Sequence, residues 1–312
     1  MMIKDALYGF VIGDVMGVPL EFMNREDLNQ HPVTKMIGGG SHNLPKGIWS
    51  DDTSMTLATM DSISSTHTID CDDIANRFCD WINYAKYTAT NLVFGVGKIT
   101  RNALFRYWNQ KKGATKCGGT SYLENGNGSL MRMLPIAFYC YNRHLNSKEI
   151  YSIVKDVSSI THAHEISILG CYIYVCYILL LLSGKNKLDS YQLLSQQDYS
   201  MFSSDSLEQY KRILSTELLS LSIDEISSSG YIVSTLEAVL WVILHTDSFE
   251  QAIIESINLG NDTDTVGAIT GSMAGILYCY SSIPQKWIDS LEGKDSLNSY
   301  LSSFIHAMDN DW

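Results

Sequence analysis

Two clusters of oxygen-bearing side chains lie far apart in the sequence. They are Ser50-Asp51-Asp52-Thr53 and Asn261-Asp262-Thr263-Asp264-Thr265. Carboxylates packed this closely repel one another unless a cation lies between them. Oxygen donors without interleaved His or Cys favour a hard divalent ion, Mg²⁺ or Mn²⁺ and less readily Ca²⁺, and disfavour zinc. The two clusters together therefore predict a divalent metal site.

Helix capping alone is a simpler explanation of each cluster. Asp51 and Asp52 precede an apolar helical pattern, where Ser50 or Asp51 suits the N-cap and Asp52 complements the helix dipole. Asp262 could cap the helix that carries Val266 in the same way. For the first cluster in isolation, capping is the more common explanation. Each cluster, however, has more hydrogen-bond acceptors than a helix start can use, and the same excess in two clusters favours the metal site.

The second cluster also permits two known motifs. An EF-hand loop starting at Asp262 requires a Glu at its twelfth position, where the sequence has Met273. The Asp-x-Asp-x-Thr/Val start of a haloacid dehalogenase-type phosphatase fits Asp262 to Val266 literally. That motif should follow an apolar strand, and residues 256–260 form a poor one. The phosphatase therefore remains a minor hypothesis.

Two glycine-rich loops lead directly into predicted helices. Gly38-Gly39-Gly40 precedes the first acidic cluster, and Gly126-Asn127-Gly128 precedes Ser129. Backbone amides left free at a helix start bind phosphate-like anions. An acidic protein could thus still hold an anionic ligand.

Helical periodicity dominates the rest of the chain, and no segment shows sustained period-two alternation, so we predict an all-α fold. Gly9, Gly13 and Gly17 recur at four-residue spacing, as do Gly267, Gly271 and Gly275. Because glycine costs a helix about 1 kcal/mol, such ladders predict that another backbone passes close by. The helical patterns cover residues 3–20, 54–64, 71–87, 96–110, 129–141, 148–159, 164–183, 207–220, 231–245, 249–258 and 265–280.

Composition limits the architecture and the partners. The 312 residues, 45% hydrophobic and without a linker-like segment, predict a single domain spanning residues 1–312 with a polar excursion at about 184–230. A formal charge of −12 disfavours nucleic acid as a main partner. The apolar run 166–182 falls short of the ~20 residues usual for a membrane span, so we expect a buried core helix and no membrane.

Cysteine usage and the first residues favour a cytoplasmic location. The chain has seven cysteines, an odd number, and no CxxC pair. Its start, Met1-Met2-Ile3-Lys4-Asp5, does not resemble a secretory signal. We therefore expect reduced thiols in the cytoplasm.

Five blocks, in this order, resemble the ADP-ribosylglycohydrolases, which include the dinitrogenase-reductase-activating glycohydrolase. They are Gly13-Asp14-x-x-Gly17-x-Pro19-x-Glu21-Phe22, Trp49-Ser50-Asp51-Asp52-Thr53, Gly126-Asn127-Gly128-Ser129-x-Met131-Arg132-x-x-Pro135, Thr161-His162-x-His164 and Gly260-Asn261-Asp262-Thr263-Asp264-Thr265-Val266-Gly267. The resemblance implies a compact, single-domain orthogonal helical bundle. It also implies a binuclear Mg²⁺ or Mn²⁺ centre that cleaves the glycosidic bond between ADP-ribose and an acceptor.

The resemblance assigns residues to roles. The metal ligands it implies are Ser50, Asp51, Asp52, Asp262, Asp264 and Thr265. The residues it places along the ADP-ribose cleft are Gly126, Asn127, Gly128, Ser129, Met131, Arg132 and His162. Glycosidic cleavage with a water nucleophile also needs a general base, and the candidate carboxylates are Glu21, Asp51 and Asp264.

Several candidate residues could serve a second, purely structural role. Arg132 could neutralise phosphate or form an ion pair with an Asp at the edge of the core, and His162 could bind ribose or merely cap a helix. The aromatic candidates for stacking on adenine, which more often serve as packing residues, are Tyr84, Tyr87, Trp108 and Tyr122.

One position departs from the family pattern. Gly95 stands where arginine-specific, nitrogenase-linked members carry an Asp implicated in ring chemistry. That role cannot be assigned to this residue.

The sequence thus predicts a metal-dependent hydrolase that releases mono-ADP-ribose from arginine side chains. Its expected partner is ADP-ribose or an ADP-ribosylated protein, and a monomer is favoured. Serine-, polymer- or small O-linked ADP-ribose are alternative substrates. A non-catalytic ADP-ribose-binding or structural protein is the alternative of another class.

Overall fold

The computed structural model describes residues 2–309 and confirms the all-α prediction. Within this range no β-strand occurs, and only three isolated bridges link loop segments. The α-helices are α1 (Met2–Gly17), α2 (Arg25–Gln30), α3 (Asp51–Thr66), α4 (Cys71–Tyr84), α5 (Lys98–Gln110), α6 (Leu134–Asn142), α7 (Ser147–Ser159), α8 (Glu165–Leu182), α9 (Lys187–Leu194), α10 (Ser204–Gln209), α11 (Ile232–His245), α12 (Phe249–Asn258), α13 (Thr263–Tyr278), α14 (Gln285–Asp289) and α15 (Lys294–Asp309). Short 3₁₀ helices are η1 (Val18–Leu20), η2 (Ala114–Lys116), η3 (Leu130–Arg132), η4 (Glu217–Leu219), η5 (Ile223–Glu225) and η6 (Tyr280–Ser282).

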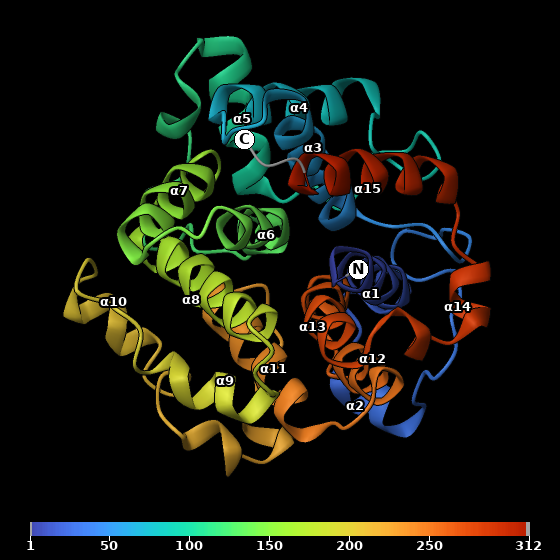
Figure 1. Cartoon of the computed structure of the whole chain (residues 1–312). Coiled ribbons are helices and arrows are strands. Elements are labelled where there is room, and N and C mark those ends of the chain that lie inside the picture. Colours follow the sequence, from blue (N-terminus) through green and yellow to red (C-terminus); the bar gives the residue numbers. More distant parts are fainter. Residues whose placement is uncertain (1, 310–312) are drawn as a thin grey trace.

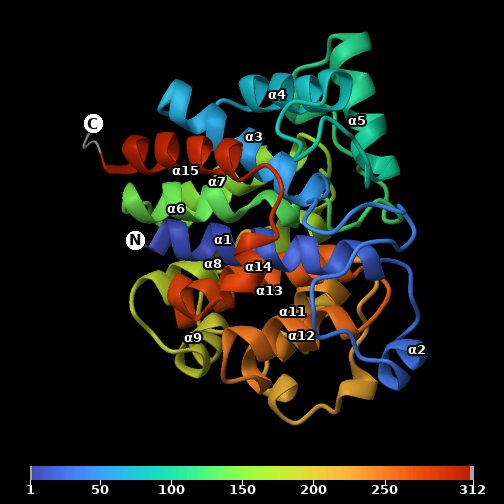
Figure 2. The same cartoon turned by 90° about the vertical axis from the view of Figure 1, so that its right-hand side faces the viewer.

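Helices α1 and α13 lie side by side at the centre of the molecule (Figures 1 and 2). A β-carbon at Gly13 would lie 1.9 Å from the carbonyl oxygen of Gly267, and one at Gly9 would lie 2.1 Å from that of Gly271. The two glycine ladders therefore face each other, as the sequence predicted. Because Gly17 meets Thr263 in the same register, the end of α1 lies beside the start of α13.

The start of α3 is fixed against α1 by a buried carboxylate. Asp14 accepts hydrogen bonds from the backbone amides of Ser50 and Thr53, at 3.1–3.2 Å, and from the Thr53 hydroxyl at 2.6 Å. Ser50 is the N-cap, and its hydroxyl accepts from the Asp52 amide at 3.1 Å. The first acidic cluster therefore lies in the first turn of α3, next to the end of α1.

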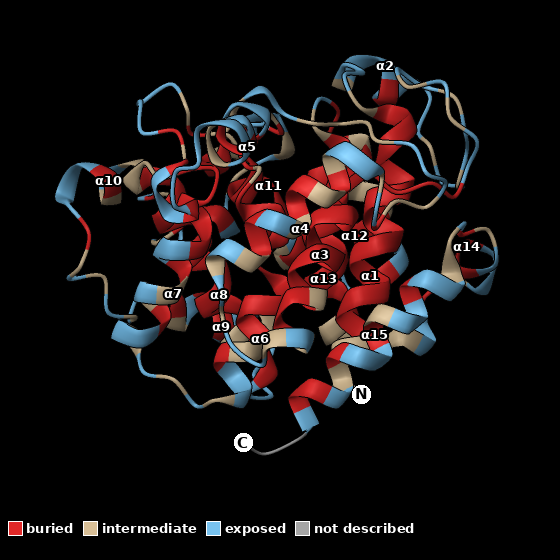
Figure 3. Ribbon diagram, turned by 90° about the horizontal axis from the view of Figure 1, so that it is seen from above, coloured by how far each residue is buried: buried red, intermediate tan, exposed pale blue. Residues whose placement is uncertain are grey.

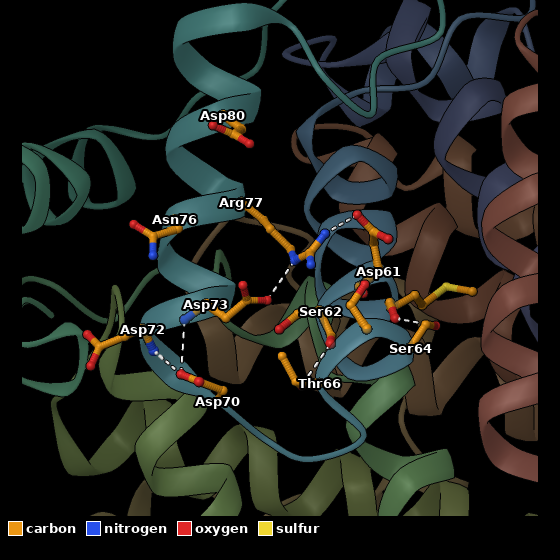
Figure 4. Close-up of polar contacts among 12 residues, drawn as sticks. Asp61, Ser62, Ser64, Thr66, Asp70, Asp72, Asp73, Asn76, Arg77 and Asp80 are labelled. Carbon is orange, nitrogen blue, oxygen red and sulfur yellow. Dashed lines mark hydrogen bonds and ion pairs between the residues drawn. The ribbon is translucent and has the colours of Figure 1, made fainter. Parts of the chain in front are cut away.

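Helix α3 is also held to α4 by an ion-pair network (Figure 4). The Arg77 guanidinium on α4 donates to Asp73 one turn earlier, at 2.7 Å, and to Asp61 on α3. Asp70 caps α4 by accepting from the amides of Asp72 and Asp73. These contacts lie away from the acidic end of α3 and orient that helix.

Helix α8 is the apolar helix anticipated at 164–183. Its length and composition would suit a membrane span, but 83% of that window is buried inside the protein. Figure 3 shows the buried residues concentrated along α8, α11, α13 and α1. Within residues 2–309 all seven cysteines are unpaired, and five of them are buried. Helix α8 therefore packs as a core helix.

The polar excursion at 184–230 packs on this core instead of projecting from it. Tyr191 and Leu194 of α9 are buried, as are Tyr210, Ile213 and Leu218 further along. Glu237 of α11 pairs with Arg212 of the excursion at 3.2 Å, which ties the excursion to a core helix.

Several predicted helices need correction. The helix predicted over 207–220 is wrong, because α10 ends at Gln209 and the chain then buries its apolar residues through turns and η4. Local bonds compete with helix here, since the Ser215 hydroxyl accepts from the Glu217 amide. The helix predicted over 129–141 breaks at Met133 into η3 and α6.

The sequence reading missed four helices, α2, α9, α14 and α15. Three of them are short. The fourth, α15, covers Lys294–Asp309 and buries Leu297, Leu301, Phe304 and Met308. Their spacing was a detectable helical signal.

Candidate active site

A cleft of about 480 Å³ opens where the ends of α1, α3, α5 and α13 meet. Its acidic side chains come from both predicted clusters and from the segment after α1. Its remaining wall is rich in glycine. The lining residues used below are Glu21, Phe22, Asp51, Asp52, Gly95, Lys98, Gly126, Asn127, Gly128, Met131, His162, Gly230, Asn261, Asp262, Asp264 and Thr265.

Asp52 joins the two acidic clusters. Its Oδ2 atom accepts a hydrogen bond from the Ser50 hydroxyl at 3.0 Å and another from the Thr265 hydroxyl at 3.3 Å. Its Oδ1 atom is buried and has no hydrogen-bond partner. The structure therefore brings the two clusters into one site and leaves a carboxylate oxygen unsatisfied there.

The buried aspartates of this site have raised pKa values. Burial, reinforced by the neighbouring negative charges, raises the pKa values of Asp51, Asp52 and Asp264 well above the usual range. Burial also raises the pKa of Asp14, to about 6, against the opposing effect of its hydrogen bonds. Among the described residues, no Lys or Arg forms an ion pair with any of these four groups.

Such a set fits hard divalent cations. The donors are carboxylate and hydroxyl oxygens, and one oxygen of Asp52 is buried without a hydrogen-bond partner. Within residues 2–309, no three His, Cys, Asp or Glu side chains already converge as a ready ligand set.

Asp262 shows that capping does not account for the second cluster. It occupies the N-cap position of α13, but its side chain makes no capping hydrogen bond. Oδ2 of Asp262 instead accepts from the side-chain amide of Asn127 at 2.7 Å. The preceding segment is helix α12, not a strand, so the phosphatase hypothesis is wrong. At Ser50, in contrast, the predicted capping coexists with a place in the site.

Glu21 follows η1 and points into the cleft. Its Oε2 atom accepts from Nε2 of His42 at 2.5 Å, and only 11% of the Glu21 side chain is exposed. Burial raises the pKa of Glu21, the His42 contact lowers it, and the Asp262 charge raises it again. Sequence reasoning did not single out His42, which lies on the glycine-rich loop before α3.

His162 and Arg132 occupy different depths. His162 lines the cleft and bonds through Nδ1 to the Thr161 hydroxyl at 2.8 Å. Burial, with the Arg132 charge nearby, lowers the pKa of His162 to about 3. Arg132 is completely buried behind it, donating to Thr161 and Val157, with its guanidinium over the Phe78 ring.

The expected contact between Arg132 and phosphate therefore needs correction, as does the alternative of an ion pair with an Asp. Ser129 is buried as well and bonds to Ser158 and Cys171 instead of lining the cleft. The other five predicted substrate-binding residues, Gly126, Asn127, Gly128, Met131 and His162, do line it.

The predicted aromatic candidates all lie elsewhere. Tyr84, Tyr87, Trp108 and Tyr122 do not line the cleft, and Tyr87 bonds to the Asp61 carboxylate in the α3–α4 interface. The aromatic residue at the cleft is Phe22, whose side chain was not predicted to take part. Its position directly after Glu21, a predicted site residue, was the feature of the sequence that could have indicated this.

Gly95 packs against the acidic cluster. Its φ is +77°, and a β-carbon there would lie 2.2 Å from Oδ1 of Asp51. A larger residue here would be strained and would have to displace the Asp51 carboxylate. The position at which the sequence departs from the family pattern therefore lies in the cleft, in contact with the first acidic cluster.

The fold and the cleft together define an all-α protein with an oxygen-donor site enclosed by glycine-rich loops. The sequence profile of the family described as ADP-ribosylglycohydrolase matches residues 2–312, so the chain belongs to that family.

Known proteins resemble this chain along most of its length. It is 33% identical over 306 residues to the ADP-ribosylarginine hydrolase Tri1 of Serratia proteamaculans, covering 97% of this chain and 78% of that protein. It is 30% identical to the ADP-ribosyl-[dinitrogen reductase] glycohydrolase of Rhodospirillum rubrum, covering 93% and 90% of the two. A solved ADP-ribosylglycohydrolase-related protein complex contains a chain with a TM-score of 0.82 at 25% identity, with 98% of each chain covered.

Proposed function

We propose that this protein hydrolyses the glycosidic bond between ADP-ribose and an arginine side chain, using two Mg²⁺ or Mn²⁺ ions. The observation that carries the proposal is the junction at Asp52, where hydroxyls from both acidic clusters converge on one carboxylate beside an unsatisfied oxygen. The arginine acceptor is favoured by the name of the Serratia relative, an ADP-ribosylarginine hydrolase.

The metal ions would be held by Ser50, Asp51, Asp52, Asp262, Asp264 and Thr265. When bound, such ions orient ribose hydroxyls and acidify a water nucleophile. The residues of the chain supply the remaining functions. Asp14 fixes the start of α3, and Asn127 fixes the Asp262 carboxylate.

Glu21 is the general base we favour among the three candidate carboxylates. Asp51 and Asp264 belong to the proposed ligand set, whereas Glu21 lines the cleft outside it. Burial raises the Glu21 pKa, and a base with a pKa nearer to the working pH accepts a proton from water more effectively. Its bond to His42 fixes the direction of the carboxylate.

The diphosphate would be held on the glycine-rich side. Lys98 begins α5 at the cleft, and Gly97 occupies the N-cap of that helix without a capping side chain. Free amides at a helix start and a lysine nearby suit phosphate oxygens. Gly126 and Gly128 leave room for the ligand next to His162.

Release from serine, polymer or small O-linked ADP-ribose is the alternative within the hydrolase class. A protein that only binds ADP-ribose is the alternative outside it. The unsatisfied Asp52 oxygen favours the hydrolase, because binding ADP-ribose alone gives no use to a buried, unpaired carboxylate oxygen.

The test is hydrolysis of an ADP-ribosylated arginine protein by the full chain in Mg²⁺, in Mn²⁺ and in EDTA. We expect turnover with either ion, loss in EDTA, and a loss of at least about 100-fold in Asp262→Asn. Asp70→Asn is the matched control, because Asp70 caps α4 away from the cleft and Asn caps equally well. Activity that resists both EDTA and Asp262→Asn would overturn the proposal, and ADP-ribose binding without turnover would favour the binding protein.

A further inference from the structure

Phe22 has a backbone conformation that its side chain does not favour. Its φ is +69°, in the left-handed region that bulky residues avoid, and 72% of the residue is exposed. An exposed ring contributes little burial to the core, so packing does not explain why a phenylalanine is held there. Strained residues of this kind concentrate at functional sites.

Two backbone hydrogen bonds impose this conformation. The Phe22 amide donates to the Asn261 carbonyl at 2.7 Å, and the Asn261 amide donates to the Met23 carbonyl at 2.8 Å. Asn261 is itself left-handed, with φ of +62°. The segment after α1 and the second acidic cluster are thus tied together, and the tie presents the Phe22 ring at the cleft.

The surroundings of the ring are acidic and aromatic. Glu21 precedes Phe22, and Asp262 follows the residue that Phe22 is bonded to. The His42 imidazole lies 6.5 Å from the Phe22 ring and 4.9 Å from the Phe94 ring. The Glu21 carboxylate is hydrogen-bonded to that same His42, and Glu21, Phe22 and Asp262 line one cleft. An aromatic ring in an acidic cleft attracts a planar cation, because guanidinium stacks on aromatic faces while pairing with acidic oxygens.

Adenine fits this position less well, because its diphosphate would be drawn toward positive charge. Among the described residues that line the cleft, Lys98 is the only lysine or arginine, against the carboxylates of Glu21, Asp51, Asp52, Asp262 and Asp264. We propose that Phe22 stacks on the guanidinium of the arginine acceptor and is a specificity-determining residue. This inference rests on the proposed function and names the part of the site that selects the leaving group.

The first test compares Phe22→Leu and Phe22→Tyr with the wild type on an arginine-linked ADP-ribosylated peptide. We expect Phe22→Leu to lower kcat/KM about tenfold, mainly through KM, and Phe22→Tyr to stay within about twofold. The affinity for free ADP-ribose, measured by calorimetry with Mg²⁺, should change less than twofold in both variants. An equal loss of ADP-ribose affinity in Phe22→Leu would overturn the inference in favour of adenine stacking.

Phe22→Gly separates recognition from folding. Glycine tolerates the left-handed conformation, so the unfolding temperature should stay the same or rise, while kcat/KM falls as in Phe22→Leu. A ring that mattered only for folding would give the opposite result, a lower unfolding temperature with unchanged kinetics in the folded fraction. That outcome would also overturn the inference.

Agmatine serves as a guanidinium probe that requires no turnover. We expect NMR saturation transfer from the protein in its ADP-ribose complex to agmatine, and its loss in Phe22→Leu. If the wild type binds agmatine in this way but hydrolyses no arginine-linked substrate, the proposed function fails, and only the contact between Phe22 and a guanidinium group stands. If the wild type hydrolyses that substrate and Phe22→Leu does so equally well, the inference fails and the proposed function stands.

Discussion

The side-chain amide of Asn127 donates one hydrogen bond to Oδ2 of Asp262, at 2.7 Å, and another to the Thr235 hydroxyl, at 2.9 Å. Both amide hydrogens are thereby used. The nitrogen must face Asp262, and one oxygen of that carboxylate is fixed in direction. The glycine-rich loop at 126–128 therefore orients a proposed metal ligand as well as lining the cleft.

Asn127→Ala should lower Mn²⁺ affinity by about 10-fold to 100-fold, because the Asp262 carboxylate loses the partner that holds it. Calorimetric titration of Mn²⁺ measures the change. Asn142→Ala is the control, since Asn142 donates a similar 2.7 Å bond to the Met308 carbonyl outside the cleft. Equal Mn²⁺ affinities in the two variants would contradict the role given to Asn127.

Gly95→Ala should reduce both stability and activity. The added methyl group would lie 2.2 Å from Oδ1 of Asp51, and alanine is strained at a φ of +77°. We expect a loss of about 1–3 kcal/mol in the free energy of unfolding, measured in urea, and at least tenfold lower kcat/KM.

The control is Gly97→Ala two residues later, where a β-carbon meets no atom within 4 Å. It should lose no more than about 1 kcal/mol, the cost of alanine at an N-cap. Equal losses in the free energy of unfolding of the two variants would show that the Asp51 contact does not decide the residue at position 95.

Much of this arrangement was predictable because it depends on local pattern. Facing glycine ladders determine how α1 packs on α13, and the register at Gly17 brings the start of α13 to the end of α1. The convergence of the two acidic clusters follows from that register once Asp14 binds the start of α3. Asp14 itself was passed over, although a carboxylate inside a glycine-rich apolar helix was the signal.

The rest depended on backbone geometry that no periodicity encodes. Phe22 reaches the cleft through a left-handed turn, and His42 reaches Glu21 from a loop. Arg132 was misplaced because the chain breaks at Met133 between η3 and α6, which turns the guanidinium into the core. A motif shared with a family identifies the segment but not the direction of each side chain.

Gly13→Ala should destabilise the fold severely. A β-carbon there would overlap the Gly267 carbonyl oxygen at 1.9 Å, and neither helix backbone can move without disturbing the acidic cluster. We expect a loss of about 3 kcal/mol or more, by denaturant unfolding. Gly113→Ala, where no atom lies within 4 Å, should stay within about 1 kcal/mol of the wild type. A small effect in Gly13→Ala would mean that the helices can separate.

His162 should remain neutral throughout the physiological range. Burial lowers its folded pKa to about 3, below the ~6.5 of an unfolded histidine. Its ring signals in an NMR titration should therefore stay constant from pH 8 to about pH 4.5, whereas in urea they should titrate near pH 6.5. A folded-state midpoint above pH 6 would contradict the burial seen here and would make His162 a candidate proton donor.

Without metal, the acidic site should make folding less favourable as pH rises. The folded pKa of Asp14 is raised to about 6, and those of Asp51, Asp52 and Asp264 are raised well above their usual range. The folded state then binds protons more tightly than the unfolded chain, so the stability present at low pH is lost as pH rises through the folded pKa values. For Asp14 alone the loss is about 3 kcal/mol. His162 acts in the opposite direction, because its lowered pKa removes stability as pH falls below ~6.5.

The difference between unfolding in Mg²⁺ and in EDTA cancels the His162 contribution, because that group titrates similarly in both. Divalent ions bind the ionised carboxylates, so the stabilisation by Mg²⁺ should grow from pH 5 to pH 7.5, by at least about 2 kcal/mol at a fixed saturating concentration. Urea unfolding at half-unit pH steps measures it. Asp264→Asn should flatten the difference, because one proton-competing ligand is removed. A stabilisation by Mg²⁺ that does not vary with pH would place the ion away from these carboxylates.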